Sequence, residues 1–208
     1  MRRALVLLLL LVLAGCGGNG GAPTDARLDP VQLVEALREG GFVVYVRHAA
    51  TDRSKEDDVV LDLEDCSTQR NLSDDGREQA RELGRALRVL EIPVGAVLAS
   101  EYCRTRETAE LAFGRAELEP ALTGFPEPGD PTFAARVRRT RELLAARPPT
   151  GENTVLVAHV KNLEEAVGRS LEEGEAAVFE PLGGTRSRFR GRIPASAWAE
   201  LVETLGPG

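Results

Sequence analysis

The chain has 208 residues and an acidic balance, with a formal net charge of −7. A length of this order fits one domain with a sizeable core. The negative charge excludes a domain held to nucleic acid mainly by phosphate neutralisation, because such domains carry a basic surface.

The first fifteen residues have the layout of a secretory signal peptide. Arg2 and Arg3 form a basic n-region, and the apolar h-region from Ala4 to Leu13 is too short to span a bilayer as a mature helix. The ending Leu-Ala-Gly-Cys resembles a bacterial lipobox, in which Cys16 is lipidated and becomes the first mature residue. An ordinary signal peptide with an incidental cysteine is the alternative.

The lipobox resemblance divides the chain into a signal peptide at 1–15, a lipidated cysteine with a flexible tether at 16–28, and a domain at 29–208. The tether is rich in Gly, Asn, Ala and Pro, a composition typical of linkers. Removal of the signal takes away two arginines and makes the net charge −9. The resemblance implies an extracytoplasmic lipoprotein that faces the periplasm or the cell surface, with a membrane as partner through its N-terminal lipid.

Helices and strands alternate along the domain. The first half is predicted to contain a helix from Asp29-Pro30 to the Gly40-Gly41 stop, a strand at 43–46, an acidic loop at 51–71, a helix at 73–90, a strand at 94–100, a helix at 104–113 and a weaker strand at 116–122. The second half is predicted to contain a helix from Asp130-Pro131 to Leu144, a strand at 154–158, a helix at 163–167, strands at 176–179 and 187–193, and a last helix after Pro194. This alternation predicts a mostly parallel sheet with helices on both sides, a three-layer α/β/α domain.

Each of the two histidines directly follows an apolar strand. His48 stands after Arg47 at the end of the first strand, and His159 stands after Ala158 at the end of a later one. In open α/β sheets, ligands bind at the carboxyl edge of the strands. Either histidine alone could be an ordinary core or loop residue, but the repeated placement favours a shared site.

Arg104 falls in the first turn of a helix that begins at the same sheet edge. Helix N-termini attract anions, and the guanidinium groups of Arg47 and Arg104 each offer a planar fork of donors to a phosphoryl group. With the two histidines, this pattern is typical of phosphoryl transfer through a histidine. No Cys, His or Glu cluster has zinc-like spacing, so neither a metal nor a cofactor is predicted. A solvated arginine at a helix start is the alternative for Arg104.

Together these motifs resemble the histidine phosphatase superfamily, which has the phosphoglycerate mutase-like fold. The resemblance implies that His48 is the nucleophile, and that Arg47, Arg104 and a protonated His159 hold the phosphoryl group. Ala49 replaces the glycine of the usual Arg-His-Gly pattern, a variant found in some branches. The segments that carry the resemblance are Val46–Thr51, Arg70–Gly76, Ser100–Ala109 and Val157–His159, and two further segments, Asp65–Ser73 and His159–Leu163, are similar to a small-phosphatase branch.

The residue that transfers the proton is less clearly marked. The common branch of the family has a glutamate shortly after the third strand, where this chain has Gly124. Glu127 and Glu175 are the candidates that remain, and Glu175 is preferred because its Gly-Glu pair resembles the small-phosphatase branch. Thr51 and Asn162 are candidates for hydrogen bonds to substrate, with a purely local role as the alternative.

Cys66 and Cys103 remain once Cys16 is assigned to lipidation. They precede two helices that are predicted to flank the same pocket. An oxidising compartment favours a disulfide between them, and two buried free thiols are the alternative.

The sequence therefore predicts a metal-independent, histidine-type phosphatase that hydrolyses a small-molecule phosphate monoester through a phosphohistidine on His48. A lipoprotein that binds a phosphate ligand without turnover is the alternative from another class. A phosphomutase is disfavoured, because export removes the protein from cytosolic sugar phosphates and the mutase-branch glutamate is missing.

Overall fold

The structure, a computed structural model, describes residues 27–124 and 129–207. The predicted signal peptide, Cys16 and Glu127 lie outside those residues. Within the described ranges, no helix combines the length and the apolar character that crossing a membrane requires. Leu28, in the predicted tether, donates its backbone N–H to the carbonyl of Arg190, so the folded domain extends back to this residue.

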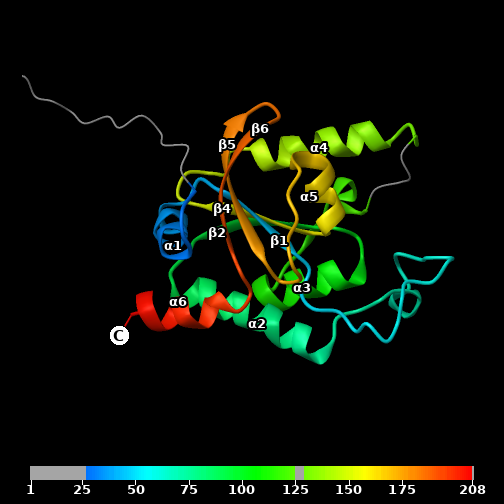
Figure 1. Ribbon diagram of the computed structural model, residues 1–208, viewed down its shortest axis with the longest axis horizontal. Helices are drawn as coiled ribbons and strands as arrows, with labels where there is room; N and C mark the ends of the chain where they lie inside the picture. Colours follow the sequence, from blue (N-terminus) through cyan, green and yellow to red (C-terminus); the bar gives the residue numbers. More distant parts are fainter. Residues whose placement is uncertain (1–26, 125–128, 208) are drawn as a thin grey trace, which may run out of the picture.

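A single mixed sheet forms the middle layer of the described chain (Figure 1), with the strand order β3-β2-β4-β1-β5-β6. The strands β3, β2, β4 and β1 are parallel, whereas β5 and β6 form an antiparallel pair that extends the sheet beyond β1. Helices lie on both sides, which confirms the predicted three-layer fold. The strands are β1 Val43–Arg47, β2 Val94–Ala99, β3 Glu117–Leu118, β4 Asn153–Ala158, β5 Ala176–Gly183 and β6 Arg186–Ile193.

The described helices divide between the two faces of the sheet (Figure 1). On one face α1, α2, α3 and α6 pack over the larger core cluster, and on the other face α4 and α5 pack over the smaller one. Their bounds are α1 Pro30–Glu39, α2 Asp74–Val89, α3 Cys103–Phe113, α4 Phe133–Ala145, α5 Val160–Val167 and α6 Ala197–Leu205, with short 3₁₀ turns at Cys66–Thr68 and Pro120–Leu122.

Strand β1 carries apolar side chains on both faces, and helices cover both faces. Val44 and Val46 belong to the core under α1 and α2, whereas Val43 and Tyr45 belong to the core under α4 and α5. This two-residue alternation is the geometry of a strand. Full burial of a side chain of valine size contributes about 1.5–3 kcal/mol, so β1 fixes the centre of the sheet strongly.

The ends of β1, β4 and β2 lie at the same edge of the sheet. Arg47 is in register with Ala158, and Ala99 is in register with Val157. Residues that directly follow these strands are therefore neighbours in space. His48, His159 and Ser100 occupy those positions.

Two predicted elements are shorter than expected. The weak strand predicted at 116–122 is only Glu117–Leu118, because Pro120 has no N–H for the ladder and begins a 3₁₀ turn. The helix predicted from Asp130 begins at Phe133, since the Asp130 carboxylate accepts the backbone N–H of Thr132 at 2.7 Å and forms a turn before it.

Candidate active site

A cavity of about 170 Å³ opens at the edge where β1, β2 and β4 end. His48 and His159 line it from the ends of β1 and β4, and Arg104 lines it from the first turn of α3. The structure thus brings together the four residues that the sequence grouped. The complete lining is Arg47, His48, Arg70, Tyr102, Arg104, Gly124, His159, Val160 and Lys161.

His48 is buried and held in one orientation. Its Nδ1 lies 2.9 Å from the carbonyl oxygen of Ala49. A carbonyl can only accept, so Nδ1 carries the proton and Nε2 keeps its lone pair. Burial lowers the pKa of His48 to about 4, and the charges of Arg104 and Arg47 act in the same direction. The imidazole is therefore neutral at neutral pH.

His159 is fixed by polar and aromatic neighbours. Its Nε2 lies 2.9 Å from the hydroxyl of Ser100, and the Tyr45 hydroxyl donates to its backbone carbonyl at 2.7 Å. The ring packs edge-on against Tyr102 at 4.8 Å and against His48 at 5.4 Å, measured between ring centroids. Burial, and then the neighbouring His48 and arginines, hold its pKa well below 6.5. The imidazole of His159 is thus neutral at neutral pH, which differs from the protonated form that the sequence led us to expect.

Arg47 approaches the pocket from the end of β1. One of its terminal nitrogens donates to the carbonyl of Leu171 at 2.8 Å, and the other lies 3.5 Å from the carboxylate of Glu173. These contacts hold the guanidinium across the sheet edge beside His48. They come from the 168–175 connection, which follows α5.

Arg104 is 6% exposed and contacts a carboxylate of the acidic loop. Its two terminal nitrogens donate to the Asp57 oxygens at 2.9 and 3.3 Å, and its guanidinium lies over the ring of Tyr102 at 4.2 Å. Asp57 also accepts the backbone N–H of Arg70 at 2.7 Å. Burial alone raises the pKa of Asp57, but the Arg70 amide and Arg104 outweigh it and keep that pKa below its usual value. Asp57 was not predicted, because the loop shows no periodicity.

Neither Glu175 nor Glu173 lines the cavity, but Glu173 forms an ion pair with Arg47, which does. The Glu175 carboxylate accepts the N–H of Glu172 at 2.9 Å and lies 3.3 Å from Arg192. Glu173 instead accepts the hydroxyl of Thr51 at 2.9 Å. Gly174, with φ of +78°, turns the backbone between the two glutamates. In the sequence, only the acidic character of residues 172–175 indicates a role for Glu173.

The two predicted hydrogen-bonding residues have partners within the protein that are distant in the sequence. Thr51 is buried, pairs with Leu72 in an isolated bridge and donates to Glu173. Asn162 is fully buried on α5 and donates to the carbonyl of Ala121 at 3.3 Å. Neither residue lines the cavity.

Cys66 and Cys103 form a disulfide in the structure, with their Cα atoms 5.7 Å apart. It ties the acidic loop to the residue directly before Arg104. The backbone N–H of Cys103 also donates to the side chain of Gln69 at 2.8 Å. Both contacts hold the loop against the start of α3.

Metal ligands are not grouped in the described part of the chain. Within residues 27–124 and 129–207, no three His, Cys, Asp or Glu side chains are placed to hold one ion. The positive charges of the pocket come from arginine and lysine side chains.

The comparisons with known proteins agree with this geometry. Residues 43–124, which include Arg47, His48 and Arg104, match the family model described as the histidine phosphatase superfamily (branch 1). His159, Glu173 and Glu175 lie beyond the matched segment. No curated protein matches the chain significantly.

Solved structures share the fold at low sequence identity. A variant of phosphoserine phosphatase from Entamoeba histolytica in complex with phosphoserine has a TM-score of 0.52 and 13% identity, over 74% of this chain and 97% of that one. The alpha-ribazole phosphatase from Shigella flexneri has a TM-score of 0.51 and 16% identity, over 72% and 94%. A phosphoglycerate mutase from Thermus thermophilus has a TM-score of 0.50 and 24% identity, over 73% and 98%. Residues 43–124 are thus similar to the histidine phosphatase superfamily (branch 1), and the chain shares its fold with these solved structures.

Proposed function

We propose that the protein is a metal-independent phosphatase that hydrolyses phosphate monoesters through a phosphohistidine on His48. One observation carries the proposal. The Nδ1 of His48 is committed to the Ala49 carbonyl, which leaves a neutral Nε2 in a cavity lined by arginines. A fixed nitrogen nucleophile beside guanidinium groups is the arrangement that phosphoryl transfer needs.

The reaction proceeds in two balanced displacements. The lone pair of His48 Nε2 attacks phosphorus, the P–N bond forms, and the ester P–O bond breaks with its electron pair on the leaving oxygen, which takes a proton. Water then attacks phosphorus and loses a proton to the group that protonated the leaving oxygen. The P–N bond breaks, and its electron pair returns to Nε2 of His48. The products are the alcohol and inorganic phosphate.

Arg47 and Arg104 stabilise the charge on the transferred group. Preorganised donors of this kind contribute roughly 3–4 kcal/mol each in mutational tests. His159 starts neutral and takes a proton as the phosphate dianion arrives, because a neighbouring negative charge raises the pKa of an imidazole. Its hydrogen bond to Ser100 keeps Nε2 oriented.

For the proton-transfer role, the contacts favour Asp57 over Glu175. Asp57 touches Arg104, whereas the Glu175 carboxylate is engaged by Arg192 outside the cavity lining. The Arg70 amide and Arg104 together lower the pKa of Asp57, and when a phosphoryl group takes the Arg104 fork, Asp57 loses the second of these partners and its pKa rises. The released carboxyl is then able to carry a proton to the leaving oxygen.

Membrane attachment through Cys16 is part of the same proposal and rests on the sequence of the first sixteen residues. Substitution Cys16→Ser removes the acceptor thiol. We expect the wild-type protein in the membrane fraction and the variant in the soluble extracytoplasmic fraction. Equal membrane association of both proteins would contradict lipidation.

The enzymatic proposal is tested with a generic aryl phosphate, in the presence and absence of a chelator. We expect turnover that survives the chelator and disappears in His48→Ala. Loss of turnover with the chelator would contradict metal independence. Phosphate binding without any turnover would instead identify a non-catalytic binding protein, and full activity of His48→Ala would overturn the mechanism.

A further inference from the structure

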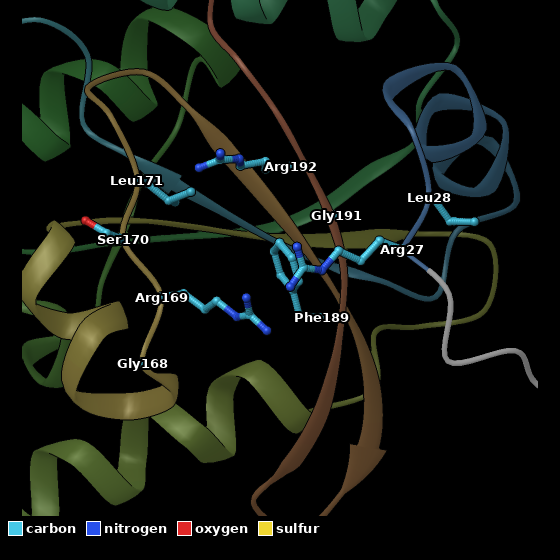
Figure 2. A pocket seen from close by; sticks show the side chains of 9 residues that line it. All are labelled: Arg27, Leu28, Gly168, Arg169, Ser170, Leu171, Phe189, Gly191 and Arg192. Carbon is cyan, nitrogen blue, oxygen red and sulfur yellow. The ribbon is translucent and has the colours of Figure 1, made fainter.

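A second cavity, of about 430 Å³, lies between the 168–171 connection and strand β6 (Figure 2). It shares no lining residue with the cavity at His48. Its volume is within the range of small-ligand sites, about 300–1,000 Å³. Figure 2 shows Arg27, Arg169 and Arg192 around it, with the Phe189 ring at its centre.

The charge in this cavity has one sign. Among its nine lining residues three are arginines and none is acidic. Arg192 reaches Glu175 at 3.3 Å, but neither Arg27 nor Arg169 forms an ion pair with a carboxylate in the part of the chain that the structure describes. Their guanidinium carbons instead lie 5.7 and 4.4 Å from the centroid of the Phe189 ring.

Cationic side chains gathered on one phenyl ring repel each other. A cation–π contact contributes about 0.5–1 kcal/mol at an exposed site, so the ring offsets only part of this repulsion. An anion placed between the guanidinium groups replaces the repulsion with attraction.

The backbone holds these side chains in position. Leu28 pairs with β6 through its N–H at 2.6 Å from the Arg190 carbonyl, and this fixes the residue next to Arg27. Gly191 permits the approach, since a Cβ at that position would lie 2.6 Å from the Leu28 carbonyl oxygen. Leu28 and Leu171 add apolar surface beside Phe189. The cavity therefore presents guanidinium forks together with apolar surface.

We propose that this cavity binds a phosphate-bearing anion with a small apolar part. Arginine forks match phosphate oxygens better than they match a point charge, and the ring and the leucines fit an acyl or alkyl group. An anionic phospholipid headgroup and a soluble phosphate ester share this chemistry. The site is independent of the proposed hydrolysis at His48.

The test uses the full chain carrying Cys16→Ser and titration calorimetry with three probes. These are short-chain phosphatidylglycerol, short-chain phosphatidylcholine as the zwitterionic control, and glycerol phosphate. We expect an anionic probe to bind the parent chain and to lose about tenfold or more in affinity when Arg27→Gln and Arg169→Gln are combined. Arg186→Gln removes a single positive charge from β6 outside the cavity, as each of the two substitutions does within it, and is expected to keep the parent affinity.

The outcomes separate the sources of the ligand. Binding of phosphatidylglycerol alone supports a lipid headgroup, and equal binding of glycerol phosphate supports a soluble ester. Binding of glycerol phosphate at His48 would give a calorimetric signal that persists in the double variant, which distinguishes it from binding in this cavity. Arg169→Lys, which keeps the charge and loses the fork, is expected to bind with intermediate affinity. Equal affinity in all variants, or no binding of either anionic probe, would overturn the proposal.

Discussion

At Arg104, the Asp57 carboxylate occupies the guanidinium fork that the proposed mechanism assigns to the phosphoryl group. Asp57 accepts from both terminal nitrogens of Arg104 and from the backbone N–H of Arg70. The Asp57 side chain is one-third exposed, so the contact can exchange with solvent and with ligand. If Arg104 binds phosphate as proposed, Asp57 competes with it for the same guanidinium.

This competition predicts that Asp57→Asn tightens product inhibition. Loss of the negative charge weakens the contact with Arg104, so the inhibition constant of inorganic phosphate is expected to fall roughly three- to tenfold. Steady-state inhibition measures the effect. Asp58→Asn changes the same charge on an exposed neighbour and is expected to leave the constant unaltered. An unaltered constant in Asp57→Asn would show that the contact does not compete.

At the scale of elements, the acidic loop at 51–71 is attached to α3 rather than free. The Cys66–Cys103 disulfide, the Gln69 side chain and the Asp57–Arg104 ion pair all join the loop to the first turn of this helix. Arg104 is thus positioned from both sides, by its helix and by the loop.

Removal of the disulfide is expected to destabilise this junction. The bond closes a loop with a sequence separation of 37, for which chain entropy gives about 3–4 kcal/mol. The double variant Cys66→Ala with Cys103→Ala is therefore expected to unfold with about 2–4 kcal/mol less free energy in urea. Reduction of the wild-type protein serves as the control and should reproduce the loss. Unchanged stability in both cases would contradict the predicted constraint.

The layers of the fold and the placement of both histidines could be predicted because they follow from local patterns. An apolar strand such as Val43–Val46 carries its own signal, and the carboxyl ends of parallel strands must share an edge. The contacts of Asp57 and Glu173 could not be predicted in this way. Asp57 lies in a loop without periodicity, so no pattern indicates its position. Glu173 lies beside a turn at Gly174, and the sequence does not distinguish it from the neighbouring glutamates.

For the whole molecule, burial of both histidines makes stability depend on pH. Burial lowers the pKa of His48 to about 4 and that of His159 well below 6.5, whereas an unfolded histidine titrates near 6.5. Between these values the unfolded chain binds more protons than the folded one. Stability is therefore full above pH 6.5 and falls as the pH decreases toward 4.

Urea unfolding at about pH 7 and about pH 5 measures this effect. Protonation of His48 is expected to cost about 2 kcal/mol of unfolding free energy over that interval, before most carboxylates titrate, and His159 acts in the same direction. The variant His48→Asn should lose about 2 kcal/mol less than the wild type between the two conditions. Equal pH dependence in both proteins would show that His48 is not held neutral by the fold.

In the proposed mechanism, His48 carries the phosphoryl group between two displacements. The direct measurement is to mix the protein with an aryl phosphate, quench in alkali within the first turnover, and map the modification by mass spectrometry. We predict an acid-labile phosphoryl group on His48, bonded to Nε2, that is absent in His48→Ala. A phosphoryl group on another residue, or turnover of His48→Ala at the wild-type rate, would contradict the mechanism.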